Sequence, residues 1–499
     1  MELLNTPDIQ LGIVGVSRDC FPVELTAKRL DALMAGLEKL GVDAFRCPTI
    51  IESEDDAMSA LEEMDQRGCD AAVIFLGNFG PEGPTTIFAQ CFAGPVMVCA
   101  AAEEAKAGMI GDRGDALCGM LNCSYNLGLR DVPAYIPQQP VGLPDELAGK
   151  IGEFVNIARV IVGLSSLKVF GFGPRPQDFL ACNAPIKPFY DLGIEVMENS
   201  ELDLYQLFRK AGEKTADITA IAADMQAELG PQCCYVDLLP KLAQLEVALL
   251  DFMDDNLGSC AYGVFADKCW PAFQEVFGFC PCYVNSRLAG RGIPVACEVD
   301  LYGAVSEYMV QLASNHPATL LDINNSVPAD VVPNGADLKG ADLADLFMGF
   351  HCGNTCSSCM KTCSLKYQLI MNRLLEEEGA EPDITRGTLE GQIMPGPMTM
   401  FRLQSTPDCQ LRSYIAEGEF LDIDPCSFGG IGIAAVPEFA RFYRHILIGK
   451  QYPHHGAFGF KKVGKVLYEA VKLLGIADIG TPLPKHLPYE GENPFELFV

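Results

Sequence analysis

The sequence predicts an α/β fold with two doubly wound parallel-sheet domains, followed by a β-rich, barrel-like domain. Short apolar runs alternate with helix-like segments up to residue 326, which is typical of parallel sheets covered by helices. Beyond Val327, glycine and proline become frequent and apolar residues alternate, which favours antiparallel strands. We therefore expect domains at residues 1–163, 164–326 and 327–499, each large enough to bury a core.

The first domain is expected to hold four strands, at Leu11–Val16, Val42–Arg46, Ala71–Leu76 and Pro95–Ala100. Leucines at positions 30, 33, 37 and 40 form one face of a helix between the first two strands. Ser53 with Asp56 resembles a capping box at the start of the next helix. Residues 131–150 are rich in proline and are expected to connect this domain to a helix at Ile151–Val162.

The same pattern recurs in the second domain. Strands are expected at Leu167–Phe172, Gly193–Val196 and Ala261–Ala266, and helices at Leu202–Arg209 and Asp237–Leu257. The domain ends with a strand at Val295–Cys297, a helix with Ala304, Tyr308 and Leu312 on one face, and a strand at Ala318–Leu321. Such a strand–helix–strand unit places the carboxyl ends of both strands at one sheet edge, where ligands bind in open α/β sheets.

The third domain is expected to contain antiparallel strands at Met398–Leu403, Gly432–Val436 and Ile446–Ile448. A helix at Lys462–Leu474 and an extended tail complete the chain.

Composition excludes several classes of function. The net charge of −30 argues against binding to nucleic acid and to anionic membranes, both of which attract basic proteins. The first residues lack the basic and apolar regions of a signal peptide, and no apolar run reaches the roughly 18 residues that span a bilayer. We therefore expect a cytoplasmic protein. Its 49% hydrophobic and 20% charged residues are ordinary for a globular enzyme.

Two loops, Ser17–Phe21 and the glycine-rich Gly77–Gly83, follow strands of the first domain. Neither contains the GxGxxG or GxxxxGK[ST] pattern that cradles phosphates, so no nucleotide cofactor is expected. The glycines of Gly77–Gly83 are explained by tight turns.

Two carboxylates, Glu298 and Asp322, follow the two strands at the end of the second domain. If they converge at one sheet edge they repel each other, unless a cation lies between them. The alternative is that each caps a helix or pairs with an arginine. The stretch is therefore a candidate metal site.

Three of the six histidines lie in glycine-flanked loops that leave them free to bind a ligand. They are His351 in GFHCGN and the adjacent His454 and His455 in PHHGAFGF. The other three are expected to be packed or solvated. A mixed set of carboxylates and imidazole suits Mn²⁺, Mg²⁺, Co²⁺ or Fe²⁺ better than Ca²⁺.

The motifs KCWPAFQ, CEVDLYGA, LLDINN, FHCGN and HHGAFGF, taken together, resemble the L-fucose isomerase/L-arabinose isomerase family, in particular its fucose isomerase branch. The resemblance implies interconversion of an aldose and its ketose on a divalent metal, Mn²⁺ or else Mg²⁺ or Co²⁺. It also implies that Glu298, Asp322 and His455 are the metal ligands. His351 matches a histidine near the family's site.

In the family's reaction a proton moves between C2 and C1 of the sugar through a cis-enediol. Glu298 and Asp322 are then expected to act as base and acid, in an order left open. The expected partner is a free monosaccharide, contacted by Arg18, Asn78, Asn324 and His351. The resemblance further implies a homo-oligomer, hexameric or trimer-based, in which N-terminal loops of a neighbouring subunit close each site.

The 21 cysteines include Cys352, Cys356, Cys359 and Cys363, with the spacing C-x3-C-x2-C-x3-C. This spacing suits Zn²⁺ or an iron–sulfur cluster, but the same four residues would also form a packed stripe on one helix face. The resembled family has no such cluster. A second hypothesis therefore stays open, in which a sugar-binding or redox protein on the same scaffold uses these cysteines.

Overall fold

A computed structural model describes residues 3–175, 179–370 and 385–496. The chain divides into two compact units, one of Pro7–Val162 with Glu469–Gly475 and a larger one of Met1–Thr6, Gly163–Tyr468 and Ile476–Val499. The larger unit contains the sheets of both the second and the third expected domain. The expected boundaries of three domains therefore stay a prediction. The α/β class is confirmed, with two parallel sheets and a larger mixed sheet.

The smaller unit contains a five-stranded parallel sheet in the order β2-β1-β3-β4-β5. The strands are β1 (Leu11–Val16), β2 (Phe45–Ile51), β3 (Ala71–Leu76), β4 (Val96–Ala101) and β5 (Val141–Gly142). Its helices are α1 (Val23–Lys39), α2 (Glu54–Arg67), α3 (Glu82–Cys91), α4 (Ala116–Leu129) and α5 (Pro144–Ser165), the last of which continues into the larger unit. Strands β1, β3 and β4 are buried along their whole length, as parallel strands covered on both faces are.

The start of helix α2 and the stretch 131–150 can be compared directly with the expectations from the sequence. The capping box at α2 is confirmed, because the backbone N–H of Asp56 donates to Ser53 Oγ at 3.2 Å and the Asp56 carboxylate accepts from the Ser53 N–H at 2.8 Å. The proline-rich stretch 131–150, expected as a connector, also contains β5 and the first turns of α5.

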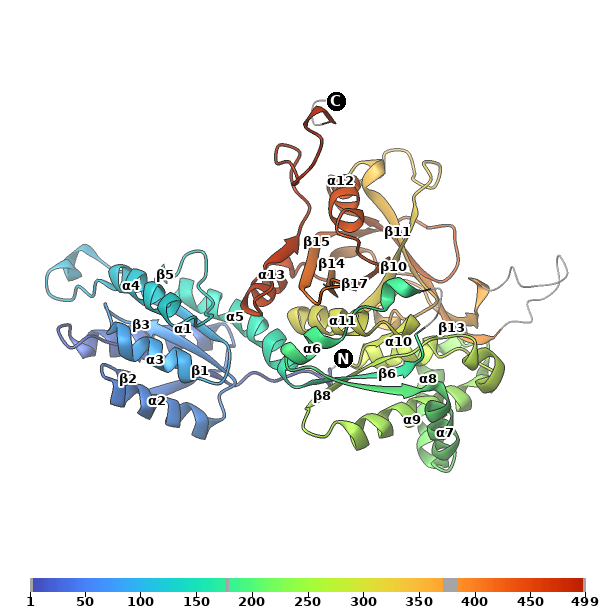
Figure 1. The fold of residues 1–499 in the computed structure, drawn as a ribbon, viewed down its shortest axis with the longest axis horizontal. Helices are drawn as coiled ribbons and strands as arrows, with labels where there is room; N and C mark the ends of the chain where they lie inside the picture. The colour runs from blue at the N-terminus through green and yellow to red at the C-terminus, as the bar shows by residue number, and fades with distance from the viewer. Residues whose placement is uncertain (1–2, 176–178, 371–384, 497–499) are drawn as a thin grey trace. The chain divides into compact units, whose positions relative to one another are not determined.

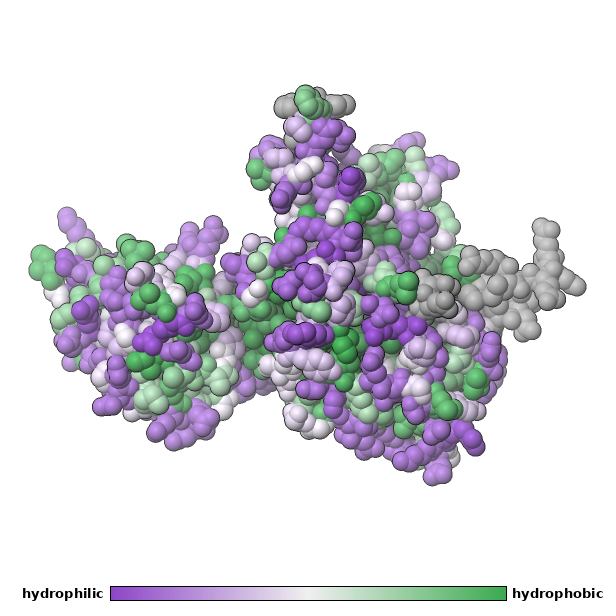
Figure 2. Space-filling model, in the orientation of Figure 1, coloured by the Kyte–Doolittle hydropathy of each residue, from purple (hydrophilic) through white to green (hydrophobic). Residues whose placement is uncertain are grey.

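An apolar stripe lies exposed along α4. Leu117, Leu121, Tyr125 and Leu129 stand four residues apart on one helix face, and each is 64–69% exposed. Figure 2 shows apolar side chains standing among hydrophilic ones in this part of the smaller unit. Exposed apolar stripes of this kind mark interaction surfaces more often than isolated exposed leucines do.

The larger unit contains a four-stranded parallel sheet in the order β7-β6-β8-β9. The strands are β6 (Leu167–Gly173), β7 (Glu195–Ser200), β8 (Tyr262–Ala266) and β9 (Val295–Ala296). The accompanying helices are α6 (Lys187–Asp191), α7 (Glu201–Ala211), α8 (Thr215–Leu229), α9 (Leu239–Asn256) and α10 (Cys282–Gly290). Phe170 and Phe265 of this sheet share a buried core with Leu242 and Leu249 of α9.

A nine-stranded, mostly antiparallel sheet completes this unit, in the order β12-β13-β16-β11-β10-β17-β14-β15-β18. The strands are β10 (Ala318–Ser326), β11 (Leu346–His351), β12 (Ser364–Tyr367), β13 (Arg386–Gln392), β14 (Gly396–Ser405), β15 (Leu411–Leu421), β16 (Gly430–Ala435), β17 (His455–Gly459) and β18 (Asp478–Gly480). Because β15 also pairs with β16, the strands from β16 to β15 close into a ring, which confirms the barrel-like architecture. Along the chain, helix α12 (Phe439–Phe442) lies between β16 and β17, and helix α13 (Gly464–Leu473) lies between β17 and β18.

Helix α11 (Leu301–Ser314) joins the four-stranded sheet to the barrel. It is buried on every side and packs against β10, β14 and β17, which lie above it in Figure 1, and against β6 and β8 of the parallel sheet. The predicted strand–helix–strand unit is therefore wrong in one respect: β9 pairs in the parallel sheet, whereas β10 pairs antiparallel with β11 and β17. The apolar run at the start of β10 fits a buried strand of either sheet, so the sequence pattern could not distinguish them.

A second expectation also fails. The stretch Ile446–Ile448 was expected as a strand, but it belongs to the helical turn Tyr443–Ile448. A short apolar run has no periodicity that separates a strand from a buried helical turn. Among the described helices, none combines the length and hydropathy needed to cross a membrane.

Candidate active site

The pairing of strands β10 and β17 brings Asp322 and His455 together. These strands are antiparallel, and Asp322 lies directly opposite His455 in their register. On the other side of β10, Asp322 pairs with Phe350, and His351 is the last residue of β11. Three residues from segments far apart in the sequence therefore meet at one end of the barrel.

Glu298 reaches the same place from the turn that follows β9. Its backbone has a left-handed conformation with φ of 58°, and Val299 follows with φ of 53°. Such a conformation costs about 1–3 kcal/mol per residue and persists only where surrounding structure enforces it. The N–H of Val299 donates to the carbonyl of Asp267 at 2.7 Å, which helps to hold the turn. The two positive φ angles turn the chain sharply between β9 and α11.

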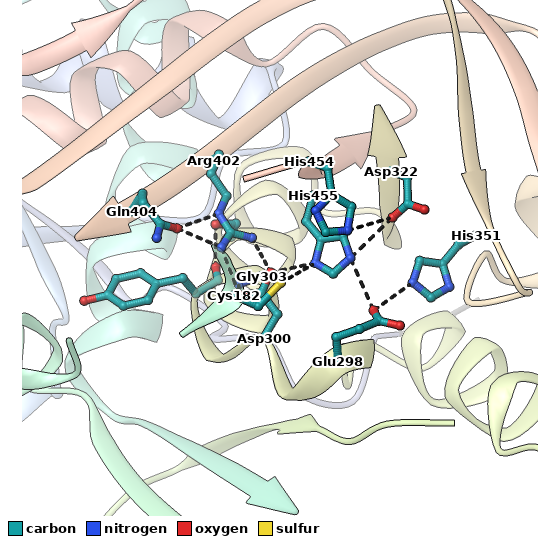
Figure 3. A network of polar contacts seen from close by, with 12 residues as sticks. Cys182, Glu298, Asp300, Gly303, Asp322, His351, Arg402, Gln404, His454 and His455 are labelled. Atoms are coloured by element: carbon teal, nitrogen blue, oxygen red, sulfur yellow. Dashed lines mark hydrogen bonds and ion pairs between the residues drawn. The ribbon is translucent and has the colours of Figure 1, made fainter. Parts of the chain in front are cut away.

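The side chains converge on the Nε2 atom of His455 (Figure 3). This atom lies 3.2 Å from Glu298 Oε2 and 3.3 Å from Asp322 Oδ1. His454 Nε2 is 3.7 Å from the same oxygen of Asp322. The strand-end carboxylates of the sequence analysis are thus close together, although they arrive from two different sheets.

His351 approaches Glu298 from the opposite side. Its Nε2 atom faces Glu298 Oε2 at 3.5 Å, and its Nδ1 atom accepts a hydrogen bond from the backbone N–H of Cys352 at 3.0 Å. Because Nδ1 accepts, Nε2 carries the ring proton and directs it toward the carboxylate. His351 thus points its N–H toward Glu298 without forming a hydrogen bond of normal geometry, and its arrangement differs from that of His455.

The ring of His455 is oriented by Asp300, which the sequence analysis did not select. His455 Nδ1 lies 2.8 Å from Asp300 Oδ2. Asp300 in turn accepts from Arg402 Nη1 at 2.5 Å and Nη2 at 2.9 Å, and from the backbone N–H of Gly303 at 2.9 Å. Gln404 accepts two further hydrogen bonds from Arg402. In the sequence, Asp300 could have been noticed only as the last residue of CEVD, just before a helix, where aspartate is a typical N-cap.

His455 Nε2 and the carboxylate oxygens that face it form a donor set that fits a divalent cation. His455 Nε2 and Glu298 Oε2 are buried, yet neither makes a hydrogen bond of normal geometry within the described residues. Nδ1 of the same ring donates to Asp300, so Nε2 is available as a ligand, and two carboxylate oxygens face it. Two carboxylates and one imidazole suit hard or borderline cations such as Mn²⁺, Mg²⁺ or Co²⁺. Glu298, Asp322 and His455 would hold such an ion, and His351 and His454 stand beside it.

The pKa shifts of Glu298 and His455 are those of a site that favours positive charge. Burial opposes ionisation of Glu298, but its interactions with His351 and His455 hold the pKa of this carboxyl well below its usual range. Burial likewise opposes a charged His455, but Cys182 and the carboxylates of Asp300 and Asp322 raise the pKa of the ring well above its ordinary value. The carboxylates thus favour any positive charge at Nε2, whether a proton or a coordinated cation.

A pocket of about 450 Å³ opens onto this cluster, and its walls are partly apolar. Among the described residues, those that line it are Phe179, Cys269, Trp270, Glu298, Asp322, Asn324, Phe350, His351, Cys352, Gln368, Ile370 and His454. Its volume suits a monosaccharide-sized ligand. A more open depression of about 960 Å³ elsewhere in the unit is lined by Glu228, Lys361 and Glu390, and no histidine is among the described residues that line it.

The four residues expected to bind substrate divide into two pairs. His351 and Asn324 line the pocket, whereas Arg18 and Asn78 belong to the smaller unit. Asn78 is buried and its amide is already engaged, since Oδ1 accepts from the Arg18 N–H at 2.9 Å and Nδ2 donates to Ser17 Oγ at 2.9 Å. A role of Arg18 and Asn78 in binding substrate stays a prediction.

The four cysteines selected by spacing do not share a helix face, because only residues 357–359 form a helical turn there. Cys356 and Cys359 interact with each other, whereas Cys363 packs against a different core. Cys352 instead interacts with Cys269, a residue that precedes it by 83 positions. The redox hypothesis that depended on a four-cysteine cluster therefore has no support in this part of the chain.

Comparison with known proteins gives matches at both ends of the chain. Residues 12–165 match the model of the fucose/sulfoquinovose isomerase N-terminal domain, and residues 349–480 match that of the L-fucose isomerase C-terminal domain. The second stretch includes His351 and His455, whereas Glu298 and Asp322 lie between the two stretches.

Similar proteins include three sulfoquinovose isomerases. That of Clostridium sp. (strain MSTE9) is 27% identical over 60% of this chain and 61% of its own length. That of Alkalicoccus urumqiensis is 24% identical over 58% of this chain and 59% of its own. That of Priestia aryabhattai is 22% identical over 93% of this chain and 97% of its own. The chain thus aligns with about six-tenths of the first two relatives and with nearly all of the third. With a fucose isomerase domain matched at each end, the chain belongs to the fucose isomerase-like family.

Proposed function

We propose that this protein is a divalent-metal-dependent aldose–ketose isomerase. One observation carries the proposal: Glu298 Oε2 and Asp322 Oδ1 both lie within 3.3 Å of His455 Nε2 at the base of a monosaccharide-sized pocket. The family membership and the names of the relatives support the same reaction class. Mn²⁺ is the proposed ion, with Mg²⁺ or Co²⁺ as substitutes.

The reaction requires a proton to leave C2 of the aldose and another to reach C1. A bound divalent cation supplies electrostatic stabilisation for the negative charge that develops on the sugar oxygens. Glu298 and Asp322 carry the proton transfers through a cis-enediol, each acting from within about 3 Å of the proton that it moves. Interactions with His351 and His455 keep Glu298 ionised, so it is ready to accept a proton. His351 Nε2 also orients its carboxylate.

The proposed substrate is a free aldose. Trp270 and Phe179, which stack edge to face at a centroid distance of 5.5 Å, form an apolar wall of the pocket. Asn324 and His351 line the pocket with polar groups and would hydrogen-bond the sugar hydroxyls. Aromatic and polar walls of this kind suit the two faces of a sugar ring.

We further propose that the protein works in the cytoplasm as a homo-oligomer, hexameric or trimer-based. The exposed apolar stripe on α4 supports an interface in the smaller unit. In such an assembly Arg18 and Asn78 of a neighbouring subunit would close each pocket.

An aldose panel tests the function. Protein stripped of metal with EDTA is assayed with each aldose in D₂O, with and without Mn²⁺, and both ketose formation and exchange of the C2 proton are followed by NMR. We expect Mn²⁺ to restore conversion of at least one aldose, with deuterium at the position that receives the proton. If Mn²⁺ binds but no aldose is converted or exchanged, the isomerase assignment is wrong.

A further inference from the structure

A cluster of thiols lies directly behind the candidate active site. Cys269, Cys280, Cys282 and Cys297 form one buried group, and Cys352 and Trp270 pack against it. They come from the segment after β8, the start of α10, the end of β9 and the end of β11. Only the fold brings these segments together, since the first and last of the five cysteines are 83 positions apart.

Cys269 is the centre of this cluster. Its thiol interacts with the thiols of Cys282, Cys297 and Cys352. The side-chain amide of Gln368 also donates to its Sγ atom at 3.0 Å. Such a donor can stabilise the thiolate that forms when a metal displaces the thiol proton.

The sulfurs of Cys269 and Cys297 and a carboxylate oxygen of Glu298 lie within 4.8 Å of one another. All three residues are at least nine-tenths buried. In a tetrahedral site with metal–sulfur bonds of 2.3 Å, two thiolate sulfurs lie about 3.8 Å apart, so small side-chain movements suffice to bring these atoms onto one ion. Cys282 and Cys352, which both interact with Cys269, are available as a fourth ligand.

We propose that Cys269, Cys297 and Glu298 form a second metal site that takes a thiophilic divalent cation such as Zn²⁺ or Cd²⁺. Thiolates prefer such ions, whereas the neighbouring site of two carboxylates and an imidazole suits Mn²⁺ or Mg²⁺. Cys269 and Cys352 both line the pocket, which gives an ion a route to the thiols. Binding releases the two thiol protons to solvent.

The two sites share Glu298, and this coupling has a functional consequence. An ion held by Cys269 and Cys297 draws the Glu298 carboxylate away from His455, which reduces isomerase activity. Only this consequence rests on the proposed function. The binding of a thiophilic ion is a property of the cluster itself, and it is measured without any substrate.

A cadmium titration tests the site. Metal-stripped protein is titrated anaerobically with Cd²⁺ in the presence of excess Mn²⁺, and the near-ultraviolet thiolate-to-cadmium charge-transfer band is recorded. The proposed catalytic site contains no thiolate, so cadmium bound there adds no such band. We expect one equivalent per chain to develop the band in the native protein, and a folded Cys269→Ala/Cys297→Ala variant to lose it. Alanine keeps the surroundings apolar, and circular dichroism checks the fold.

Two further variants locate the ion. Cys356→Ser/Cys359→Ser removes another interacting thiol pair of the same unit, neither member of which is among the described residues that line the pocket, and is expected to keep the band. Glu298→Gln is expected to weaken Cd²⁺ binding by at least about tenfold, as loss of a ligand does. A band that persists in the folded Cys269/Cys297 variant, or that disappears in the Cys356/Cys359 variant, overturns the proposal and leaves the thiols as packed small hydrophobes.

Discussion

His455 Nδ1 lies 2.8 Å from Asp300 Oδ2, although 155 positions separate the two residues in the sequence. Arg402 binds both oxygens of Asp300, and all three side chains are fully buried. The hydrogen bond orients the imidazole so that its other nitrogen faces Glu298 and Asp322. Metal-binding histidines are commonly oriented in this way by a carboxylate behind the ring.

Asp300→Asn should therefore weaken Mn²⁺ binding by about 10–100-fold, because an amide neither attracts the Nδ1 proton as strongly nor balances Arg402. The affinity is measured by electron paramagnetic resonance titration of Mn²⁺. Asp345→Asn serves as the matched control, since Asp345 is another buried acid of the same unit that accepts from the Ala440 N–H at 2.9 Å. Unchanged Mn²⁺ affinity in a folded Asp300→Asn variant would show that Asp300 does not orient His455.

Glu298→Gln and Asp322→Asn should each reduce turnover by at least about 10³-fold, because an amide cannot accept the proton that a general base removes. Both substitutions preserve size, and thermal unfolding checks that the fold survives. The substitution Asp330→Asn, at an exposed position in the turn after β10, is the control and should leave turnover unchanged. Substantial aldose–ketose conversion by either carboxylate variant would rule out this mechanism.

The exposed apolar stripe on α4 predicts an interface between subunits, and charged side chains introduced into the stripe should disrupt it. Leu121→Glu combined with Tyr125→Glu places two carboxylates on the stripe and should dissociate the assembly, which light scattering coupled to size-exclusion chromatography measures. Leu202→Glu is the control, because Leu202 is 63% exposed on α7 and lies outside the stripe. If both proteins show the same mass as the unaltered chain, α4 does not form the interface.

Asp267 predicts a specific dependence of stability on pH. Burial raises the pKa of this carboxyl to about 7, although Asn285 Nδ2 donates to both its oxygens at 3.0 and 3.2 Å. In the unfolded chain the group loses its proton near pH 3.8, whereas in the folded protein it keeps the proton until about pH 7. The free energy of unfolding therefore falls as pH rises through this window, by up to about 4 kcal/mol from this group alone.

The Asp267→Asn variant lacks this titration and retains a neutral partner for Asn285. Its stability relative to the unaltered protein should increase as pH rises from 4 to about 7 and then level off, as measured by urea unfolding at several pH values. Asp203→Asn is the control and should show no trend between pH 4 and 7, because hydrogen bonds from Ser200 lower the pKa of Asp203 and its contribution is lost only as pH falls below about 3.8. A stability difference for Asp267→Asn that does not change with pH would contradict the raised pKa.

Local features of the fold were predictable from the sequence, because they depend on neighbouring residues. The capping box of Ser53 and Asp56 and the fully buried strand Ala71–Leu76 appear as expected. Their signals are a cap three residues from its partner and an apolar run bounded by turns. In the candidate site, Glu298, Asp322 and His455 were identified from their motifs, and the structure places them together, while their role as ligands remains to be tested.

Only the tertiary structure decided the features that depend on distant segments. The pattern of Ala318–Leu321 could not show that β10 leaves the parallel sheet and joins the barrel, because the same apolar run packs well in either. Nothing near His455 indicated Asp300 as its partner, and the spacing of Cys352 with Cys356 suggested the wrong neighbours. Sequence spacing records contacts within a helix or a turn, whereas contacts across 83 or 155 positions exist only once the chain has folded and the barrel has packed against α11.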